Sequence, residues 1–378
     1  MGVAGAALGV PSADLSSAHA PAGDAIKLAA GINLSHWFAQ HHDYSATRLQ
    51  RDFTVEDARL IKALGFDHVR FTVDPAPLLG LAARREESRQ VLEATKVVLD
   101  AAYLKLLDAA MATLLDAGLN VVFDIHPEDH LKLALKDSDP HLAGFAKLWS
   151  LLAAHLKQHG PGRVALELIN EPRVEDDGRW RTVASELVKA IRQQTTRHTI
   201  IVASPAWSNI DTLVKMKPLE GERLIHTFHM YEPFIFTHQG ANWAGPQWEV
   251  LRDVPYPSSP ELVAPVLAKT TNAEARRNLQ WYGQERWNAE RIGKEIKRVA
   301  DWAAENRAQV YCGEFGAYRR FAPREGRLQF TRDLRLAFEK HRIGWAMWDY
   351  RGGFSLLADP ARRKPDEELL AALGLGRK

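Results

Sequence analysis

Two features of the 378-residue sequence predict an α/β fold, a single (β/α)8 TIM barrel with a long loop insertion after strand 6. Short apolar runs alternate about eight times with segments of helical period, as they do in that barrel. The runs also lack regular polar alternation, so they suit parallel strands buried on both faces. An open doubly wound sheet is the alternative, but the sequence contains neither glycine-rich phosphate motif expected of one.

The strands are expected where Val, Ile, Leu and aromatic residues cluster. In chain order they are Gly31–Leu34, His68–Thr72, Asn120–Ile125, Val164–Ile169, Thr199–Ala203, Leu224–His229, Val310–Glu314 and Gly344–Trp348. Helical segments lie between most of them. A capping pattern at Thr54 and Asp57 begins one helix and Gly65 ends it, and a stripe from Leu104 to Leu114 marks another.

The longest break in this pattern runs from Tyr231 to Tyr282, after the sixth strand. A loop of that length in a compact domain is usually functional or carries small elements of its own. We therefore expect an insertion within one barrel domain over residues 30–378. Residues 1–29 are expected to form a separate N-terminal segment, either the remnant of a leader or a disordered terminus.

Composition limits the partners that this chain is expected to bind. The chain has 49 Lys and Arg against 47 Asp and Glu, a net charge of +2. It therefore lacks the excess of basic residues that is typical of proteins that bind nucleic acid or anionic membranes. The single cysteine, Cys312, excludes an intrachain disulfide and a multi-cysteine zinc site. No apolar run is long enough to span a membrane as a helix. We expect a monomer that binds neither nucleic acid nor membranes.

The N-terminal segment carries part of an export signal. Val3–Val10 is apolar and Ala18-His19-Ala20 resembles a leader cleavage site, but the usual positive charges at the start are missing. A secreted or periplasmic protein is the expectation, and a cytoplasmic one is the alternative.

Polar or aromatic residues stand at or near the C-terminal ends of most of the predicted strands, where barrel active sites are built. They are Arg70, His126, Asn170, Glu171, His229, Tyr231, Glu314 and Trp348. Glu171 and Glu314 could meet across the barrel mouth. Glycoside cleavage needs such a pair, one acid for the leaving oxygen and one carboxylate facing the anomeric carbon. Taken alone, the two residues are equally well explained as strand-end carboxylates in ion pairs.

Two motifs carry a resemblance to a known family. Leu168-Ile169-Asn170-Glu171-Pro172 resembles the acid/base signature of glycoside hydrolase family 5, the cellulase-type members of the retaining (β/α)8 clan. Gly313-Glu314-Phe315-Gly316 is similar to its nucleophile motif, and Gly31–Phe38 to its first strand. The resemblance spans roughly residues 30–350. It implies a retaining O-glycosyl hydrolase that cleaves a β-linked polysaccharide or oligosaccharide without a cofactor or metal.

The resemblance also implies roles for the catalytic pair and its immediate partners. Glu171 would be the acid/base, and Glu314 the nucleophile that forms a covalent glycosyl-enzyme. Asn170 would bind the sugar 2-hydroxyl, while Arg70 and Tyr231 would hold Glu314 ionised and aimed. The charge of Glu314 should raise the pKa of Glu171 and keep it protonated. A separation of about 5–5.5 Å between the carboxyl groups would give retention.

The remaining candidates surround this pair. His229 would lie beside Glu171, His126 would contact the bound sugar, and Trp348 would form the floor beneath it. Indole rings offer sugars a flat apolar surface, so we expect Trp37 and Trp243 to contact substrate. The tryptophans expected in loops at this end are Trp37, Trp207, Trp243 and Trp248. Those expected to pack from helices onto the barrel are Trp149, Trp180, Trp287 and Trp302.

Two buried residues are expected in supporting places. Glu167, a carboxylate within a strand, should pair with a cation inside the barrel. Cys312 should share the inward face of Glu314. The acidic and histidine residues from His126 to His130 lack the helical spacing of a zinc hydrolase, so no metal is expected.

A cellulase-like endo-β-glucanase is the leading interpretation. An exo-β-1,3-glucanase and a β-mannanase are the close alternatives, because loop shape rather than fold selects the substrate. A transglycosylase would use the same intermediate with a sugar acceptor. A non-catalytic carbohydrate-binding barrel would need a missing glutamate, and both glutamates are present.

Overall fold

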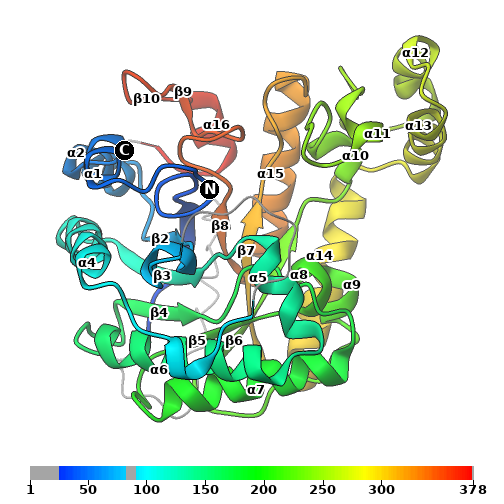
Figure 1. Cartoon of the computed structure of the whole chain (residues 1–378). Coiled ribbons are helices and arrows are strands. Elements are labelled where there is room, and N and C mark those ends of the chain that lie inside the picture. Colours follow the sequence, from blue (N-terminus) through cyan, green and yellow to red (C-terminus); the bar gives the residue numbers. More distant parts are fainter. Residues whose placement is uncertain (1–24, 82–90, 377–378) are drawn as a thin grey trace, which may run out of the picture.

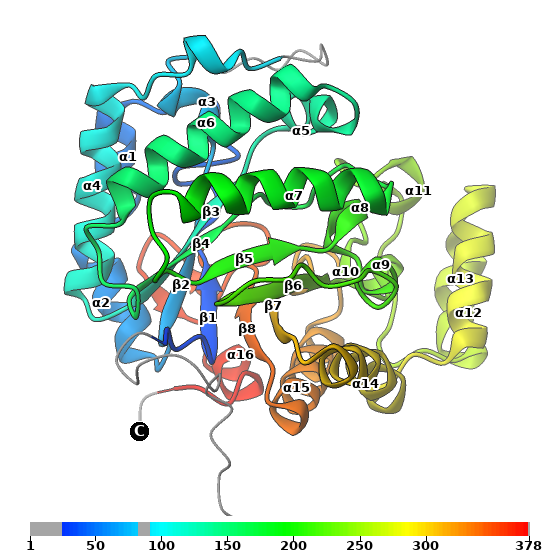
Figure 2. The same ribbon diagram turned by 90° about the horizontal axis from the view of Figure 1, so that it is seen from below.

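The computed structural model describes residues 25–81 and 91–376. Eight parallel strands close into a barrel in the order β1 to β8, and helices surround it (Figures 1 and 2). The strands are β1 (Ala30–Asn33), β2 (His68–Val73), β3 (Asn120–Ile125), β4 (Val164–Glu167), β5 (Ile200–Ala203), β6 (Leu224–Met230), β7 (Gln309–Phe315) and β8 (Gly344–Met347). The predicted barrel is confirmed, with strand ends shifted by at most two residues.

Long helices cover the outside of the barrel. They are α1 (Ala46–Asp52), α2 (Val55–Ala63), α4 (Ala101–Asp116), α6 (Asp139–Leu156), α7 (Asp177–Arg192), α14 (Ala289–Asn306), α15 (Arg324–His341) and α16 (Glu367–Ala372). Short elements lie in the loops: α3 (Pro75–Leu78), η1 (Ala94–Lys96), α5 (Asp129–Leu133), η2 (Ala134–Lys136), α8 (Pro205–Ser208), α9 (Ile210–Leu213), β9 (Leu357–Asp359) and β10 (Lys364–Pro365). The capping box predicted at Thr54 and Asp57 begins α2, and Gly65, with a φ of 101°, follows its end.

The predicted insertion after β6 contains four helices: α10 (Phe234–Thr237), α11 (Pro246–Glu249), α12 (Pro260–Lys269) and α13 (Ala273–Glu285). The last two pack against each other and project from the barrel as an arm (Figures 1 and 2). The arm is tied at its base, where Tyr282 donates its hydroxyl to the Pro255 carbonyl at 2.7 Å. The insertion does not change the strand order of the barrel, in which β6 still pairs with β7.

The core has two parts. The larger part fills the space between strands and helices, and the smaller lies inside the barrel. The inner residues are Val122, Ala165, Ile201, Tyr311 and Ala346. Ile26 and Leu28 pack against this inner layer. Of the N-terminal segment predicted over residues 1–29, residues 1–24 lie outside the described part of the chain.

Strand β7 carries a bulge directly before Glu314. Phe228 of β6 pairs with Cys312, but the next residue, His229, pairs with Glu314, so Gly313 is the extra residue. A β-bulge of this kind re-aims the side chain that follows it. A methyl group at Gly313 would lie only 3.1 Å from Nε2 of His229, which explains why a residue without a side chain stands there.

The bulge corrects one expectation, that Cys312 faces inward with Glu314. Tyr311 points into the barrel, where its hydroxyl lies 2.8 Å from Nε2 of His68. Because side chains alternate along a strand, Cys312 faces the surrounding helices, and the extra residue brings Glu314 back to the inside. Burial raises the pKa of the Cys312 thiol well above its ordinary range, so the thiol stays protonated and unreactive.

Two tryptophans tie the helical layer to the strand ends. Trp149 of α6 donates to the Leu168 carbonyl at 2.8 Å, and Trp180 of α7 donates to the Ala203 carbonyl at 2.9 Å. Both indoles are buried, as predicted. Leu168 directly follows β4 and Ala203 ends β5. The helices are therefore anchored at the end of the barrel that carries the predicted site.

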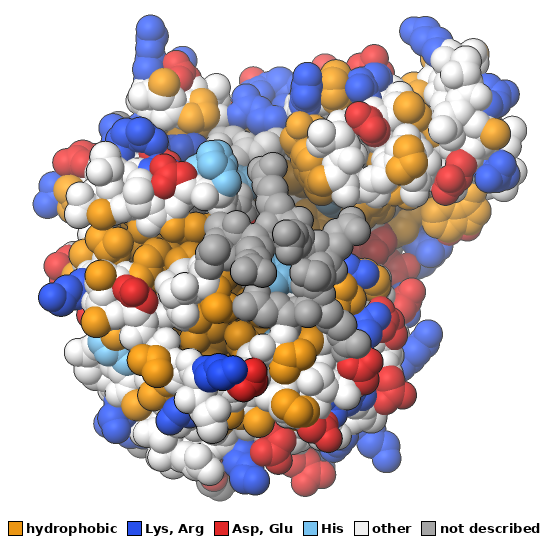
Figure 3. Space-filling model, viewed as in Figure 1, with side chains coloured by type: hydrophobic (Ala, Val, Ile, Leu, Met, Phe, Trp, Pro, Cys, Tyr) orange, Lys and Arg blue, Asp and Glu red, His pale blue; other side chains and the backbone are white. Residues whose placement is uncertain are grey.

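The described surface shows both signs of charge. Lys and Arg side chains are interspersed with Asp and Glu on the face shown in Figure 3. Within residues 25–81 and 91–376, none of the helices combines the length and the apolar character needed to cross a membrane.

Replacing Trp149 by Phe tests the anchoring of α6. The change leaves the buried Leu168 carbonyl without its donor, so we expect the free energy of unfolding to fall by about 1–3 kcal/mol. Urea unfolding followed by circular dichroism measures this. Trp281→Phe, on a side chain that is 55% exposed, is the matched control and should stay within about 0.5 kcal/mol of the wild type. Equal stability of both variants would contradict the anchoring role.

Candidate active site

The guanidinium of Arg70 lies at the centre of the barrel mouth and is fully buried. Arg70 stands in the middle of β2, not near its end as the sequence suggested. Its Nε and Nη2 donate to the two oxygens of Glu167 at 2.8 and 2.9 Å, and Nη1 donates to Glu314 at 2.7 Å. Nη2 also lies 3.0 Å from Oδ2 of Asp124. The predicted pairing of Glu167 with a buried cation is confirmed.

These contacts gather three carboxylates around one cation. Burial alone would lower the pKa of the Arg70 guanidinium, but the charges of Asp124, Glu167 and Glu314 raise it well above its ordinary value. In return, burial raises the pKa of Asp124 to about 6 and also raises that of Glu167, although the Arg70 cation opposes both shifts. Arg70 is therefore permanently charged and holds the carboxylates around it in place.

Each oxygen of Glu314 has its own donor. Arg70 binds Oε1, and the hydroxyl of Tyr231 donates to Oε2 at 2.8 Å. Burial and the neighbouring carboxylates, Glu314 first among them, raise the pKa of Tyr231 well above its ordinary value, so the phenol keeps its proton and remains a donor. The carboxylate of Glu314 is thereby oriented from two sides, as the resemblance implied.

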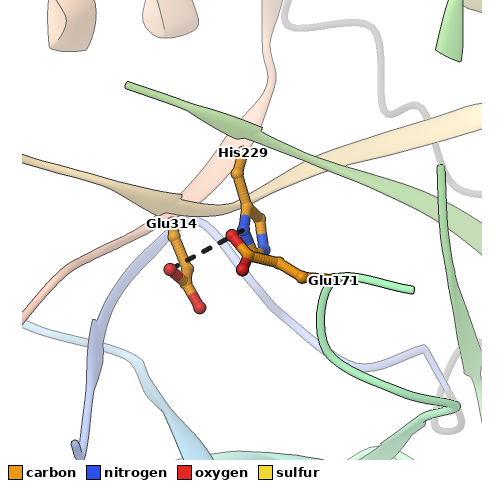
Figure 4. Close-up of side chains that lie close together, drawn as sticks. All are labelled: Glu171, His229 and Glu314. Carbon is orange, nitrogen blue, oxygen red and sulfur yellow. Dashed lines mark hydrogen bonds and ion pairs between the residues drawn. The ribbon is translucent and has the colours of Figure 1, made fainter. Parts of the chain in front are cut away.

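Glu171 and His229 form a hydrogen-bonded pair beside Glu314 (Figure 4). Nδ1 of His229 lies 2.9 Å from Oε1 of Glu171 and 3.6 Å from Oε2 of Glu314. One oxygen of each glutamate and a ring nitrogen of His229 lie within 4.8 Å of one another. Glu171 itself has a φ of 43°, a left-handed conformation that costs a residue with a side chain about 1–2 kcal/mol. The backbone is thus strained at the residue that the sequence marks as the acid/base.

The protonation of this pair differs from the expectation. Burial would raise the pKa of Glu171, but the hydrogen bond and the charge of His229 lower it to about 2. Burial would lower the pKa of His229, but the carboxylates of Glu314 and Glu171 raise it. The single proton of the pair therefore rests on His229 in the free site, 2.9 Å from the oxygen of Glu171. The sequence predicted that His229 lies beside Glu171 but did not show where the proton rests.

His126 and Asn170 line the same mouth. Nδ1 of His126 lies 2.8 Å from Asp124, and its Nε2 lies 3.1 Å from Nδ2 of Asn170. Burial, reinforced by the charges of Lys132 and Arg70, lowers the pKa of His126 to about 3, so the ring is neutral. Nδ1 then donates to Asp124 and Nε2 accepts from Asn170.

Asp124 and Asn33 are site residues that the sequence reasoning did not select. Asp124 orients His126, and Asn33 accepts a hydrogen bond from Nη1 of Arg70 at 3.0 Å. The two-residue period of β3 places Asp124 on the inward face with Val122, which could have indicated its role.

The predicted aromatic residues take different positions. Trp348 is buried, and its ring lies parallel to that of His126 at 5.8 Å between centroids. Trp37 does not reach the mouth: its indole donates to the Leu49 carbonyl at 2.8 Å and stacks on Phe53. Trp37 is therefore a core residue, because a β1 loop that folds back over α1 buries its ring.

The other loop tryptophans lie nearer the surface. Trp243 is 60% exposed and meets Tyr318 edge to face at 4.8 Å. Trp207 is 45% exposed, and Trp248 is half-buried against Phe234. Trp243 and Trp207 therefore have ring surface that a ligand could cover.

In the described ranges, the His and carboxylate side chains close enough together for a metal ion are the same three residues, Glu171, His229 and Glu314. Arg70 and Tyr231 already occupy the oxygens of Glu314. The raised pKa of His229, caused by the two carboxylates, favours a proton at the nitrogen that a metal would need. We interpret the trio as an acid–base group.

Comparisons with known proteins agree with this geometry. The sequence profile of cellulases, glycosyl hydrolase family 5, matches residues 32–353. Endoglucanase 3 of Fibrobacter succinogenes is 29% identical over 361 residues, which cover 92% of this chain and 53% of that protein. Endoglucanase C of Acetivibrio thermocellus is 26% identical over 357 residues, 92% of this chain and 98% of that protein.

Solved structures resemble the barrel closely. Endoglucanase Cel5A of Thermotoga maritima superposes with a TM-score of 0.71 at 26% identity, covering 92% of this chain and 97% of that chain. The chain thus spans about half the length of Endoglucanase 3 and nearly all of the other two proteins.

Replacing Arg70 by Met tests its role as the shared cation. The variant leaves buried carboxylates without their shared cation, and we expect a loss of about 3–5 kcal/mol in the free energy of unfolding at pH 7. Arg70 opposes the rise in the pKa of Asp124 and Glu167, so its removal should raise both folded pKa values further. The native variant then binds more protons than the native wild type, and the loss should shrink as the pH falls from 7 to 5. Chemical unfolding at several pH values measures both effects.

The matched control is Arg298→Met, which removes a partly exposed arginine paired with Asp211 and Glu295. That change should cost less than about 1 kcal/mol. A loss at Arg70 that does not depend on pH would show that packing, not charge, explains the effect.

Proposed function

The chain belongs to glycosyl hydrolase family 5, the cellulases, and from that membership we propose that it is a retaining endo-β-glucanase. One observation carries the proposal: an oxygen of Glu171 and one of Glu314 lie within 4.8 Å of each other across the barrel mouth. Retaining enzymes place their carboxyl groups about 5–5.5 Å apart, whereas inverting enzymes need about 6.5–9.5 Å to admit a water. The close approach therefore supports a double displacement.

In the first step, Glu314 attacks the anomeric carbon. Arg70 and Tyr231 donate hydrogen bonds to its two oxygens, so the attacking carboxylate is fixed in direction. The proton held between His229 and Glu171 passes to the glycosidic oxygen through Glu171 as the bond to the leaving sugar breaks. Asn170, aligned by Arg70 and His126, is placed to bind the 2-hydroxyl, where contacts strengthen in the transition state.

In the second step, the ester at Glu314 is hydrolysed. Esterification removes the negative charge of Glu314, which is the largest contribution that raises the pKa of His229. The pair has given its proton to the leaving sugar in the first step, and the loss of the Glu314 charge keeps the pair deprotonated, so Glu171 can accept a proton from the attacking water. The same two residues thus serve as acid and then as base.

A β-glucan cut within the chain is the substrate that we propose. The similar proteins reported above are endoglucanases. A series of ring contacts leads away from Glu314, from Tyr231 to buried Phe354 at 5.9 Å, on to half-buried Tyr318 at 5.7 Å and then to Trp243 at 4.8 Å. The Trp243 ring at the end of this series is 60% exposed, so it offers a sugar an apolar face away from the catalytic pair. Exo-β-1,3-glucanase and β-mannanase activity are the alternatives that a substrate panel separates.

Product release from β-1,4-glucan, β-1,3-glucan and β-mannan tests the proposal. The wild type should cleave β-1,4-glucan with a rapid fall in viscosity, and Glu314→Ala should abolish turnover. Glu171→Ala should slow polysaccharide cleavage by about 10²–10⁴-fold, because the leaving sugar needs a proton. An aryl glycoside with a good leaving group needs no acid, so its first step should slow much less. Glu305→Ala, at an exposed position on α14, is the matched control. Activity that survives Glu314→Ala would refute the assignment.

The pH profile tests the shared proton. Activity needs one proton on the His229–Glu171 pair, so the rate should fall at alkaline pH as this proton is lost. The pH of half-maximal activity should lie above the ordinary histidine pKa of about 6.5, because the carboxylates raise the pKa of His229. In His229→Asn the alkaline limb of the pH–rate profile should move to lower pH, because a carboxyl group alone then holds the proton. Initial rates from pH 4 to 9 measure it, and an unmoved limb would exclude His229 from the proton path.

A further inference from the structure

A buried lysine without a partner stands at the barrel mouth. Lys132 of α5 is only 6% exposed. Lysine side chains are almost never buried this deeply unless they are paired. Within residues 25–81 and 91–376, however, the Lys132 ammonium makes neither a hydrogen bond nor an ion pair. The mechanism proposed above does not use this cation either.

The neighbours of Lys132 show which way its segment faces. Asp129, three residues earlier on α5, pairs with Arg173 in the loop that follows β4. Lys136, at the end of η2, pairs with Glu175 of the same loop at 2.8 Å. Residues three apart on a helix lie on the same side of it. Lys132 therefore faces this loop too, and the loop also carries the acid/base (Figure 4).

The effects of the Lys132 charge agree with that position. Burial lowers the pKa of His126 most, and the charge of Lys132 comes second, ahead of that of Arg70. The Arg70 guanidinium is itself only one carboxylate away from the His126 ring. Burial raises the pKa of Glu171, whereas the charges of His229 and then of Lys132 lower it. Because such effects weaken with distance, the Lys132 ammonium lies close to both His126 and Glu171.

The place and the charge of this ammonium indicate the ligand that it suits. In the proposed function, His126 and Glu171 flank the scissile bond, so a bound glucan brings its hydroxyl groups to this point. Acidic groups already outnumber basic ones in the mouth, which disfavours an anionic ligand. The acidic groups are Asp124, Glu167, Glu171 and Glu314, and the basic ones are Arg70, Lys132 and His229. A neutral acceptor, the oxygen of a sugar hydroxyl, suits a group that can only donate.

We propose, on the basis of the proposed function, that Lys132 is a substrate-binding residue whose ammonium donates a hydrogen bond to a hydroxyl oxygen of the sugar at the scissile bond. The two ion pairs that tie α5 and η2 to the loop after β4 hold the ammonium in a fixed direction. A charge-assisted hydrogen bond of this kind is stronger than a neutral one. The protein therefore keeps an unpaired buried cation, at a cost to its stability, because the substrate supplies the partner.

Lys132→Met tests the proposal, since it keeps the length of the side chain and removes its charge and its donors. In Glu314→Gln, which stops turnover, the added change should raise the dissociation constant of cellotetraose about 10- to 100-fold, as titration calorimetry measures it. In the active enzyme, kcat/KM on cellotetraose should fall by a similar factor. Lys132→Arg keeps a charged donor and should retain more affinity. Lys136→Met, from the same segment, is the matched control and should change either value less than about twofold.

Urea unfolding separates binding from folding. Removal of an unpaired buried cation should leave the unfolding midpoint of Lys132→Met equal to that of the wild type or above it. A lower midpoint with unchanged affinity would overturn the proposal, because Lys132 would then be structural. Unchanged affinity with a shifted pH–rate profile would overturn it as well, because Lys132 would then act only through its charge on Glu171.

The neutral ligand and the proposed function are tested separately. Tighter binding of carboxymethylated cellotetraose than of cellotetraose by Glu314→Gln would overturn the choice of a neutral acceptor. No measurable binding of cellotetraose by Glu314→Gln would overturn the sugar contact itself. A wild type inactive on all glucans would refute the proposed function, while about tenfold weaker binding after Lys132→Met would still support the contact.

Discussion

The buried guanidinium of Arg70 is the interaction on which the rest of the site depends. Three carboxylates converge on it from β3, β4 and β7, and burying charges of one sign together without a cation would be strongly destabilising. A guanidinium suits this task because its planar fork reaches several oxygens at once, which a lysine could not do. One side chain therefore positions Glu314, the proposed nucleophile, together with Asp124, which orients His126, and the amide of Asn170.

A second constraint is the number of protons available beside that cation. Glu171, His229 and Glu314 share a small volume, and the hydrogen bond between Glu171 and His229 leaves one proton in the pair. The charge of Glu314 raises the pKa of His229 and so helps the pair to hold that proton, and in the proposed mechanism this charge is lost when Glu314 is esterified. The chemistry of one glutamate therefore sets the protonation of the other through a histidine.

Much of the fold and of the site could be predicted from the sequence, since strand burial and strand-end polarity are local patterns. The eight strands and the insertion follow from them, whereas the neighbours of Glu314 were implied by the resemblance to family 5. Other features depend on geometry that no local pattern records. The bulge at Gly313 turns Cys312 outward, the fold of the β1 loop buries Trp37, and the pKa of Glu171 depends on a histidine 58 residues away. The two-residue period of β3 puts Asp124 on the inward face, but its contact with Arg70 depends on the pairing of β3 with β2.

The arm of α12 and α13 can change in evolution without any change in the barrel that carries the carboxylate cluster. It leaves and rejoins the barrel between β6 and β7, and it is tied at its base by contacts such as that between Tyr282 and Pro255. Its length and surface can diverge through insertion, deletion or exchange while the strand register and the carboxylate cluster stay intact. Evolution can thus alter what reaches the barrel mouth without rebuilding the chemistry inside it.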